Sequence, residues 1–272
     1  LLEGEQGDRQ HEALALSVVV TGGAGAIAPA VRWATRSDAL ALRSLEIRLG
    51  EDDTGALAHN AQRIVAAVDA VRADMGGAAG DDPGGAAGDD PAGGIDAEVY
   101  VEMPRSRSGD LSTSWLEALD VLAVAGLRAK FRTGGVDADA FPGAAELAAC
   151  IGAALDREVP FKCTAGLHNA LRHRNHEDFE RPVDMHGFLN VLLATRASLD
   201  GANGEETAAV LDDPDPLAGV DADSHAAGWA SARRWFTSFG SCSIDEPLTD
   251  LIALSLVEPV ETTEPVETLE RE

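Results

Sequence analysis

Short strand-like segments alternate with helical segments along most of this chain, and this alternation limits the folds that it can adopt. The five clearest strand-like segments are rich in Val, Ile and Leu or alternate apolar with polar residues; they are 13–23, 42–50, 97–104, 127–135 and 160–166. Helical periodicity predicts helices between them, at 27–39, 57–75, 112–125 and 143–156. Strands separated by helices in this way indicate right-handed βαβ crossovers and a parallel sheet.

The remainder of the chain follows this rhythm less regularly. Residues 169–184 are highly charged and predict a loop, and residues 185–198 predict an apolar helix. Residues 207–211 fit either a sixth strand or a helical turn. Residues 226–235 then predict a helix, and residues 235–243 predict a last strand.

This order of elements predicts an α/β fold, namely a (βα)8 barrel of the TIM type. Because the sequence begins at Leu1 and not at Met, we expect the first barrel strand to precede it. A doubly wound open parallel sheet is the alternative. The first glycine turn, at 21–28, does not have the spacing of a dinucleotide-binding loop, and no cofactor is predicted.

The barrel is predicted to occupy residues 1–256 as a single domain. Within it, residues 76–94 contain Gly-Gly-Ala-Ala-Gly-Asp-Asp-Pro twice in tandem, a composition that cannot bury a core and predicts a flexible surface insertion. Residues 257–272 repeat Glu-Pro-Val-Glu-Thr and predict an acidic disordered tail.

The chain is strongly acidic, with 47 acidic residues against 21 basic residues and a net charge of -26. This charge argues against nucleic acid and anionic membranes as partners, and we expect no membrane span. The three cysteines, Cys150, Cys163 and Cys242, have no CxxC spacing, so we expect reduced thiols, a cytoplasmic location and no structural zinc site of the cysteine type. The sequence leaves open whether the chain forms a homo-oligomer.

Ionisable side chains share one face of four successive predicted strands. Side chains alternate along a strand, and the apolar residues of each strand occupy one set of alternate positions. The other set, which we expect to face the barrel interior, carries Glu46, Arg48, Glu98, Tyr100, Glu102, Lys130, Arg132, Lys162 and Thr164. A polar layer near the carboxyl ends of the strands is typical of an active site in this fold. A purely structural network of ion pairs is the alternative, because buried charges must be paired.

Lys130 and Lys162 are the only lysines in the chain, and both lie within predicted strands. A lysine that is removed from water beside other cations can act as a base or form a Schiff base with a carbonyl group. The residues around them, Phe-Lys-Cys-Thr-Ala-Gly (161–166) and Lys-Phe-Arg-Thr-Gly-Gly (130–135), resemble two strands of the deoxyribose-phosphate aldolase type of class I aldolases, although in the opposite order. The resemblance implies a (βα)8 barrel, with Lys162 as the Schiff-base lysine and Lys130 as the lysine that tunes it.

Small residues follow two of the strands directly, where backbone N–H groups can hold an anion. We expect phosphate or carboxylate binding from the segments Thr133-Gly134-Gly135 and Gly240-Ser241, together with Arg48, Arg132 and Thr164. His168, His173, His176 and His186 offer a rival site on the charged loop. Their spacing matches no standard metal motif, so no metal is predicted, and His168, nearest the strand end, is expected to act as an acid or base.

These patterns favour a lyase or isomerase that acts on a small anionic carbonyl compound. Lys162 would be the nucleophile or base, Lys130 its tuner and Glu102 a general acid or base. A metal-dependent hydrolase or lyase that uses the loop from His168 to His186 is a second hypothesis. A non-catalytic barrel that binds a metabolite or a protein is the third.

The composition also generates a prediction about salt. An acidic, almost lysine-free chain rich in Ala, Gly, Asp and Val resembles the proteins of extreme halophiles. At about 1 M salt the Debye length falls to roughly 3 Å, so the repulsion between its acidic side chains is screened. We therefore expect the melting temperature to rise between dilute buffer and molar KCl. A melting temperature that stays constant or falls over this range would exclude the halophilic interpretation.

Overall fold

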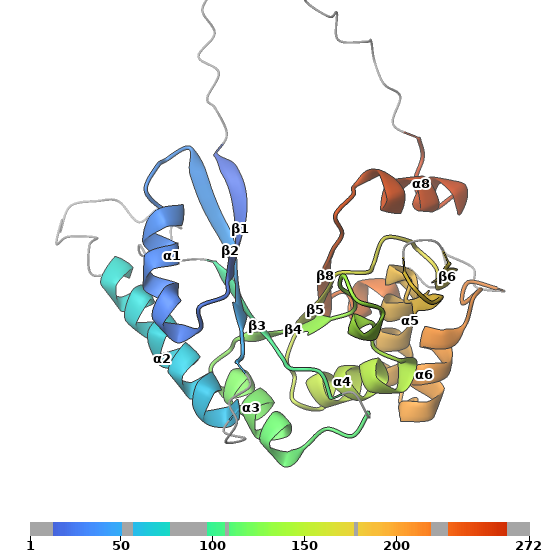
Figure 1. The fold of residues 1–272 in the computed structure, drawn as a ribbon, viewed down its shortest axis with the longest axis horizontal. Coiled ribbons are helices and arrows are strands. Elements are labelled where there is room, and N and C mark those ends of the chain that lie inside the picture. Colours follow the sequence, from blue (N-terminus) through green and yellow to red (C-terminus); the bar gives the residue numbers. More distant parts are fainter. Residues whose placement is uncertain are drawn as a thin grey trace, which may run out of the picture.

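Six parallel strands form one curved sheet in a computed structural model, which describes residues 13–50, 57–76, 97–106, 109–176, 179–218 and 228–259. The strands are β1 (Leu14–Val20), β2 (Leu40–Arg48), β3 (Glu98–Glu102), β4 (Arg128–Arg132), β5 (Phe161–Thr164) and β8 (Phe236–Gly240). The sheet curls through 208°, so it is a half-barrel and not a closed barrel (Figure 1).

The order of the strands decides between the two predicted architectures. They lie in the order β1-β2-β3-β4-β5-β8, which follows the sequence without a reversal. A doubly wound sheet reverses its strand order at a switch point, so that alternative is wrong. The predicted barrel is correct in being a curled parallel α/β sheet, but wrong in being closed. The winding is that of a barrel, but the sheet stops short of a full turn.

Helices cover the outer, convex face of the half-barrel (Figure 1). They are α1 (Ile27–Ala34), α2 (Leu57–Gly76), α3 (Thr113–Val124), α4 (Ala144–Asp156), α5 (Phe188–Leu199) and α6 (Gly204–Asp212), with the short 3-10 turns η1 (Ala24–Ala26) and η2 (Ala138–Ala140). A further helix, α8 (Asp245–Ala253), lies beyond the end of β8. Ser112 caps helix α3, since its Oγ accepts a hydrogen bond from the Trp115 amide at 3.2 Å.

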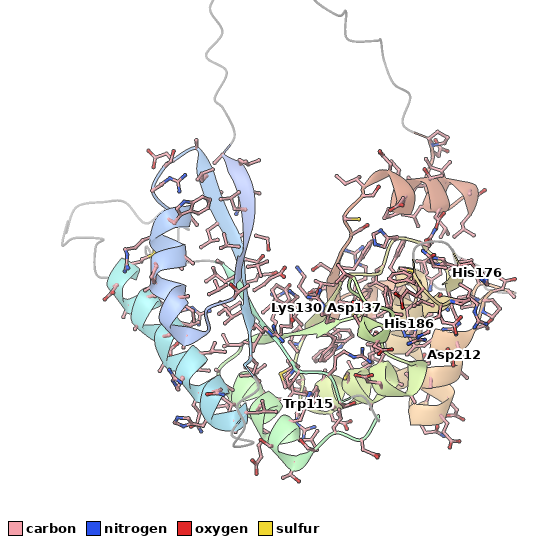
Figure 2. The ribbon with its side chains drawn as sticks, viewed as in Figure 1. Trp115, Lys130, Asp137, His176, His186 and Asp212 are labelled. Atoms are coloured by element: carbon pink, nitrogen blue, oxygen red, sulfur yellow. The ribbon has the colours of Figure 1, made fainter. Side chains whose placement is uncertain are left out.

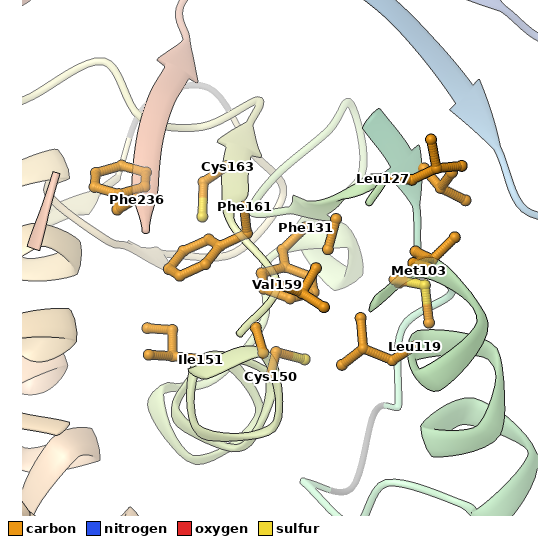
Figure 3. Packing of buried hydrophobic residues seen from close by; sticks show 14 of the residues in the cluster. Met103, Leu119, Leu127, Phe131, Cys150, Ile151, Val159, Phe161, Cys163 and Phe236 are labelled. Carbon is orange, nitrogen blue, oxygen red and sulfur yellow. The ribbon is translucent and has the colours of Figure 1, made fainter. Parts of the chain in front are cut away.

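The core lies between the sheet and these helices (Figure 3). Four aromatic rings follow one another across it, with centroid distances of 6.3 Å for Trp115–Phe131, 5.2 Å for Phe131–Phe161 and 5.7 Å for Phe161–Phe236. The strand residues that point outward are apolar, as the alternation predicts, and burial of each large one contributes about 1.5–3 kcal/mol. The opposite set of strand residues therefore faces the concave side.

One local prediction in the second half of the chain is wrong, because the charged loop at 169–184 contains an antiparallel hairpin of β6 (His173–Asn175) and β7 (Val183–Met185). Of the two alternatives for residues 207–211, the helical one is confirmed. They belong to helix α6, which a capping box between Asn203 and Glu206 begins. The predicted insertion, apart from its first residue, and nearly all of the predicted acidic tail lie outside the described residues.

One segment, Ala138–Asp156, is long and apolar enough to cross a membrane, judged by its length and composition alone. It comprises η2 and α4, which Phe141, Pro142 and Gly143 separate. Half of it is buried, and α4 packs its apolar face in the core. The segment therefore has the character of a core helix.

Candidate functional site

Four ionised side chains form a cluster on the concave face, and we call Glu46, Glu102, Lys130 and Lys162 the charged cluster. The strand register places Glu102 beside Lys130 and Lys130 beside Lys162. Glu46 reaches them from β2, which pairs with β3. Lys130 lies near the middle of the curve (Figure 2). The predicted sharing of one face is therefore confirmed for these four residues.

Glu46 joins the two lysines. Its Oε1 lies 2.5 Å from Lys162 Nζ and its Oε2 lies 2.7 Å from Lys130 Nζ. Lys130 Nζ is also 2.8 Å from Glu102 Oε2. The four side chains are only 6–14% exposed. Two carboxylates and two ammonium groups thus balance one another in a largely desolvated network.

The lysines control the ionisation of Glu46. Burial alone would raise the pKa of its carboxyl group, but hydrogen bonds from Lys130 and Lys162, together with their positive charges, outweigh burial and lower that pKa below its ordinary value. Ser17 Oγ also donates a hydrogen bond to Glu46 Oε1 at 3.3 Å. Glu46 is therefore held in its charged form.

Glu46 was not among the catalytic residues predicted from the sequence, although the strand alternation placed it on the right face. Its central position depends on which lysine side chains reach its carboxylate, and strand register alone does not decide this.

Tyr100 also lies beside the charged cluster, because its ring centroid is 5.0 Å from Lys162 Nζ. Burial raises the pKa of the Tyr100 hydroxyl, which donates a hydrogen bond to Glu98 at 2.7 Å.

Two arginines border the charged cluster at the carboxyl ends of their strands. Arg48 and Arg132 line an open cleft of about 240 Å³ together with Glu102 and Arg105. Arg132 Nη1 lies 4.0 Å from Glu102 Oε1, and its side chain is 46% exposed. Arg105 is paired with Glu146, which lies on α4. Arg132 Nε also donates a hydrogen bond to the Gly134 carbonyl oxygen at 2.9 Å. Both Arg48 and Arg132 are exposed, so solutes can reach them.

The segment Thr133-Gly134-Gly135 makes close contacts within the fold. The Thr133 amide and hydroxyl both donate to carbonyl groups at the end of β5. A Cβ atom on Gly134 would lie 2.9 Å from the Gly166 Cα, which explains the glycine there as a point of close approach. A Cβ atom on Gly135 would lie 2.8 Å from Ala140 Cβ.

The second predicted anion-binding segment, Gly240-Ser241, lies beside Thr164 at the ends of β8 and β5. Gly240 lies against Thr164, where a Cβ atom would be 3.3 Å from Thr164 Cγ2, and Ser241 Oγ accepts a hydrogen bond from the Ser243 amide at 3.2 Å. Thr164 Oγ1 is buried and has no hydrogen-bond partner among the described residues. Among the described buried side chains predicted to bind an anion, Thr164 is the one whose polar atom lacks a hydrogen-bond partner.

The histidines of the charged loop do not form one site within the described part of the chain. His186 is buried and its Nε2 lies 2.9 Å from the Pro142 carbonyl oxygen, while His176 is exposed. Burial lowers the pKa of both His186 and His173. His168 lies apart from these contacts, with its Nδ1 3.0 Å from Glu246 Oε2 and 3.6 Å from Cys242 Sγ.

The network predicts a specific stability effect for Glu46→Gln. The substitution leaves both buried lysines without their shared carboxylate, so we expect it to lower the free energy of unfolding by about 3–5 kcal/mol at pH 7. Denaturant titrations in molar KCl would measure this. The matched control is Glu98→Gln, because Glu98 is 44% exposed in its pair with Arg128 and should cost no more than about 1 kcal/mol. Equal losses in the two variants would contradict the network.

The same network predicts how this loss depends on pH. Because the pKa of Glu46 is lowered in the folded state, its contribution is present above the ordinary value of 4.5 and is lost as the pH falls through the lowered pKa. The difference between the wild-type chain and Glu46→Gln should therefore shrink below pH 4.5. A difference that grew on acidification would have the wrong sign.

Comparison with models of known protein families, with curated proteins and with solved structures finds no match to this chain, so its family is not identified.

Proposed function

We propose that this protein is an enzyme, a lyase or isomerase that acts on a small anionic carbonyl compound through Lys162. The observation that carries the proposal is the carboxylate of Glu46, which bridges the only two lysines of the chain on the concave face. A network of this kind places a nucleophile, Lys162, and a cation, Lys130, each within hydrogen-bond distance of one proton acceptor, Glu46.

The two arginines at the carboxyl ends of β2 and β4 favour an anionic substrate. Arg48 and Arg132 both line the cleft and both are exposed. The acidic residues Glu102, Asp137 and Asp139 line the same cleft, so its overall charge is not what would attract an anion. The support comes from the guanidinium groups themselves, which can hold a carboxylate or phosphate by charge-assisted hydrogen bonds.

The geometry suggests how the lysines would share the chemistry. Lys162 would transfer a proton to Glu46, 2.5 Å away, and its neutral amine would then add to the substrate carbonyl carbon. Glu46 would return this proton to the hydroxyl group of the adduct, so that loss of water leaves an iminium ion and an ionised Glu46. The iminium ion accepts the electron pair released by C–C cleavage or by proton removal. Lys130 would remain an ammonium group beside Glu46, and Glu102 would be the acid or base toward the substrate.

A second candidate is a non-catalytic protein that binds a small anionic metabolite. It is favoured by the low exposure of Lys162, whose side chain is only 11% exposed, and by its absence from the cleft lined by the two arginines. In that case the charged cluster would be structural. The two candidates differ in whether Lys162 ever becomes covalently bound to a carbonyl compound.

Reductive trapping separates these candidates. The protein in molar KCl is incubated with pyruvate, dihydroxyacetone phosphate or glyceraldehyde 3-phosphate and then with sodium borohydride, and the modified peptides are sequenced by mass spectrometry. We expect one stable adduct per chain on Lys162, because borohydride reduces an iminium ion to a secondary amine.

Two variants serve as controls for trapping. Lys162→Met should abolish the adduct, whereas Lys130→Met should slow its formation at least tenfold but leave it on Lys162. Circular dichroism would establish that both variants fold. Equal modification of both lysines would indicate nonspecific chemistry, and binding of these compounds without any adduct would favour the non-catalytic candidate.

A further inference from the structure

We propose that His168, Cys242 and Glu246 form a binding site for one divalent metal ion of the zinc type, and we call these residues the rim triad. It lies beyond the carboxyl ends of β5 and β8. The proposal rests on observations separate from the charged cluster, so it stands or falls independently of the proposed lyase or isomerase activity.

The three donor atoms are close enough to bind one ion. Cys242 Sγ lies 3.6 Å from His168 Nδ1, which lies 3.0 Å from Glu246 Oε2, and all three donors lie within 4.8 Å of one another. Tetrahedral zinc, with bonds of about 2.3 Å to sulfur and about 2.0 Å to nitrogen or oxygen, separates such ligands by about 3.3–3.6 Å. The distance between Cys242 and His168 matches this range, and a small shift of the Glu246 side chain would complete the geometry. The described residues contain one group of donors of this kind, and it is the rim triad.

The arrangement does not suit a cysteine nucleophile activated by histidine. In such a triad the thiol and the carboxylate bind opposite nitrogens of the imidazole ring. Here Nδ1 is the nearer ring nitrogen for Cys242, at 3.6 Å against 3.9 Å for Nε2, and it also contacts Glu246. Without a metal ion, an Nδ1–H group would donate a hydrogen bond to Glu246. A cation would replace that proton and be bound by one lone pair from each of Nδ1, the carboxylate and the thiolate.

The fold holds the triad from three segments. His168 follows β5 and Cys242 follows β8, and these neighbouring strands pair with Thr164 beside Gly240. Glu246 lies in the first turn of α8. That helix is attached to the loop after β5 by Asp250, whose Oδ2 accepts hydrogen bonds from the Ala170 amide at 2.8 Å and the Asn169 side chain at 3.1 Å.

The exposure of the triad indicates what the metal would do. Cys242 is exposed, and the side chains of His168 and Glu246 are 26% and 53% exposed. Three protein ligands with an open side are typical of catalytic zinc sites, in which water or a substrate oxygen takes the fourth position. Close by, His173 has a buried Nδ1 without a hydrogen-bond partner among the described residues, which adds a nitrogen near this rim.

Cobalt binding provides the first test. The protein is treated with a chelator in molar KCl and titrated with Co²⁺ alone, while absorption spectra are recorded. We expect one Co²⁺ per chain, with the intense visible bands of tetrahedral cobalt and a sulfur-to-cobalt charge-transfer band. Cys242→Ser should remove the charge-transfer band, and His168→Gln should weaken binding at least 100-fold. His176→Gln, at an exposed histidine outside the triad, is the matched control and should change neither.

Thiol alkylation of the unaltered chain provides a test that needs no variant. Burial raises the pKa of Cys150 to about 12 and raises that of Cys163 further, so iodoacetamide should react at Cys242 alone. Stoichiometric Zn²⁺ should slow this alkylation at least tenfold. Cobalt binding without a charge-transfer band, no binding below about 1 mM, or alkylation at the same rate with and without Zn²⁺ would overturn the proposal.

Discussion

The interaction on which the concave face depends is the carboxylate of Glu46 between two lysines. Removal of a lysine from water is costly, and two lysines on adjacent strands, as Lys130 and Lys162 are, also repel each other. Glu46 offsets both costs because one carboxylate oxygen faces each ammonium group. Such a network need not make the protein more stable than an apolar interior would, and under the proposed function it would hold Lys162 beside its proton acceptor.

The open curvature of the sheet explains why charges can occupy this face. A closed (βα)8 barrel packs layers of apolar side chains in its interior. The half-barrel buries its apolar residues on the convex face, under the helices, and directs the other set of strand residues into the concave side. The arginines at the carboxyl ends of the strands can then meet a solute while the lysines beneath them stay largely shielded.

Strand alternation predicted the most from the sequence. It assigned Glu102, Lys130 and Lys162 to one face, because a period of two is a local property of the chain. The curl of the sheet could not be predicted, since the pattern of strands and helices is the same for a closed and an open barrel. The short run at 207–211 fits a strand as well as a helix, and the capping box between Asn203 and Glu206 decides for the helix.

The rim triad is the part that sequence reasoning missed. Cys242 and Glu246 lie more than 70 positions after His168 and meet it only because β8 pairs with β5. The hairpin of β6 and β7, helix α5 and helix α6 intervene, so their adjacency is a property of topology and not of spacing. The histidines that lie close to His168 in the sequence are on the charged loop, yet the side chains that contact His168 are Cys242, which follows β8, and Glu246, which lies on α8.

The central claim is that the concave face binds a small anion, and calorimetric titration with pyruvate and inorganic phosphate, at the lowest salt that keeps the chain folded, tests it most directly. The account predicts one binding site, whose affinity falls at least tenfold when both Arg48 and Arg132 are replaced by Gln. Replacement of Arg36 and Arg174, which are exposed and lie outside the face, should leave the affinity unchanged. Absence of binding, or equal affinity in both double variants, would contradict the account.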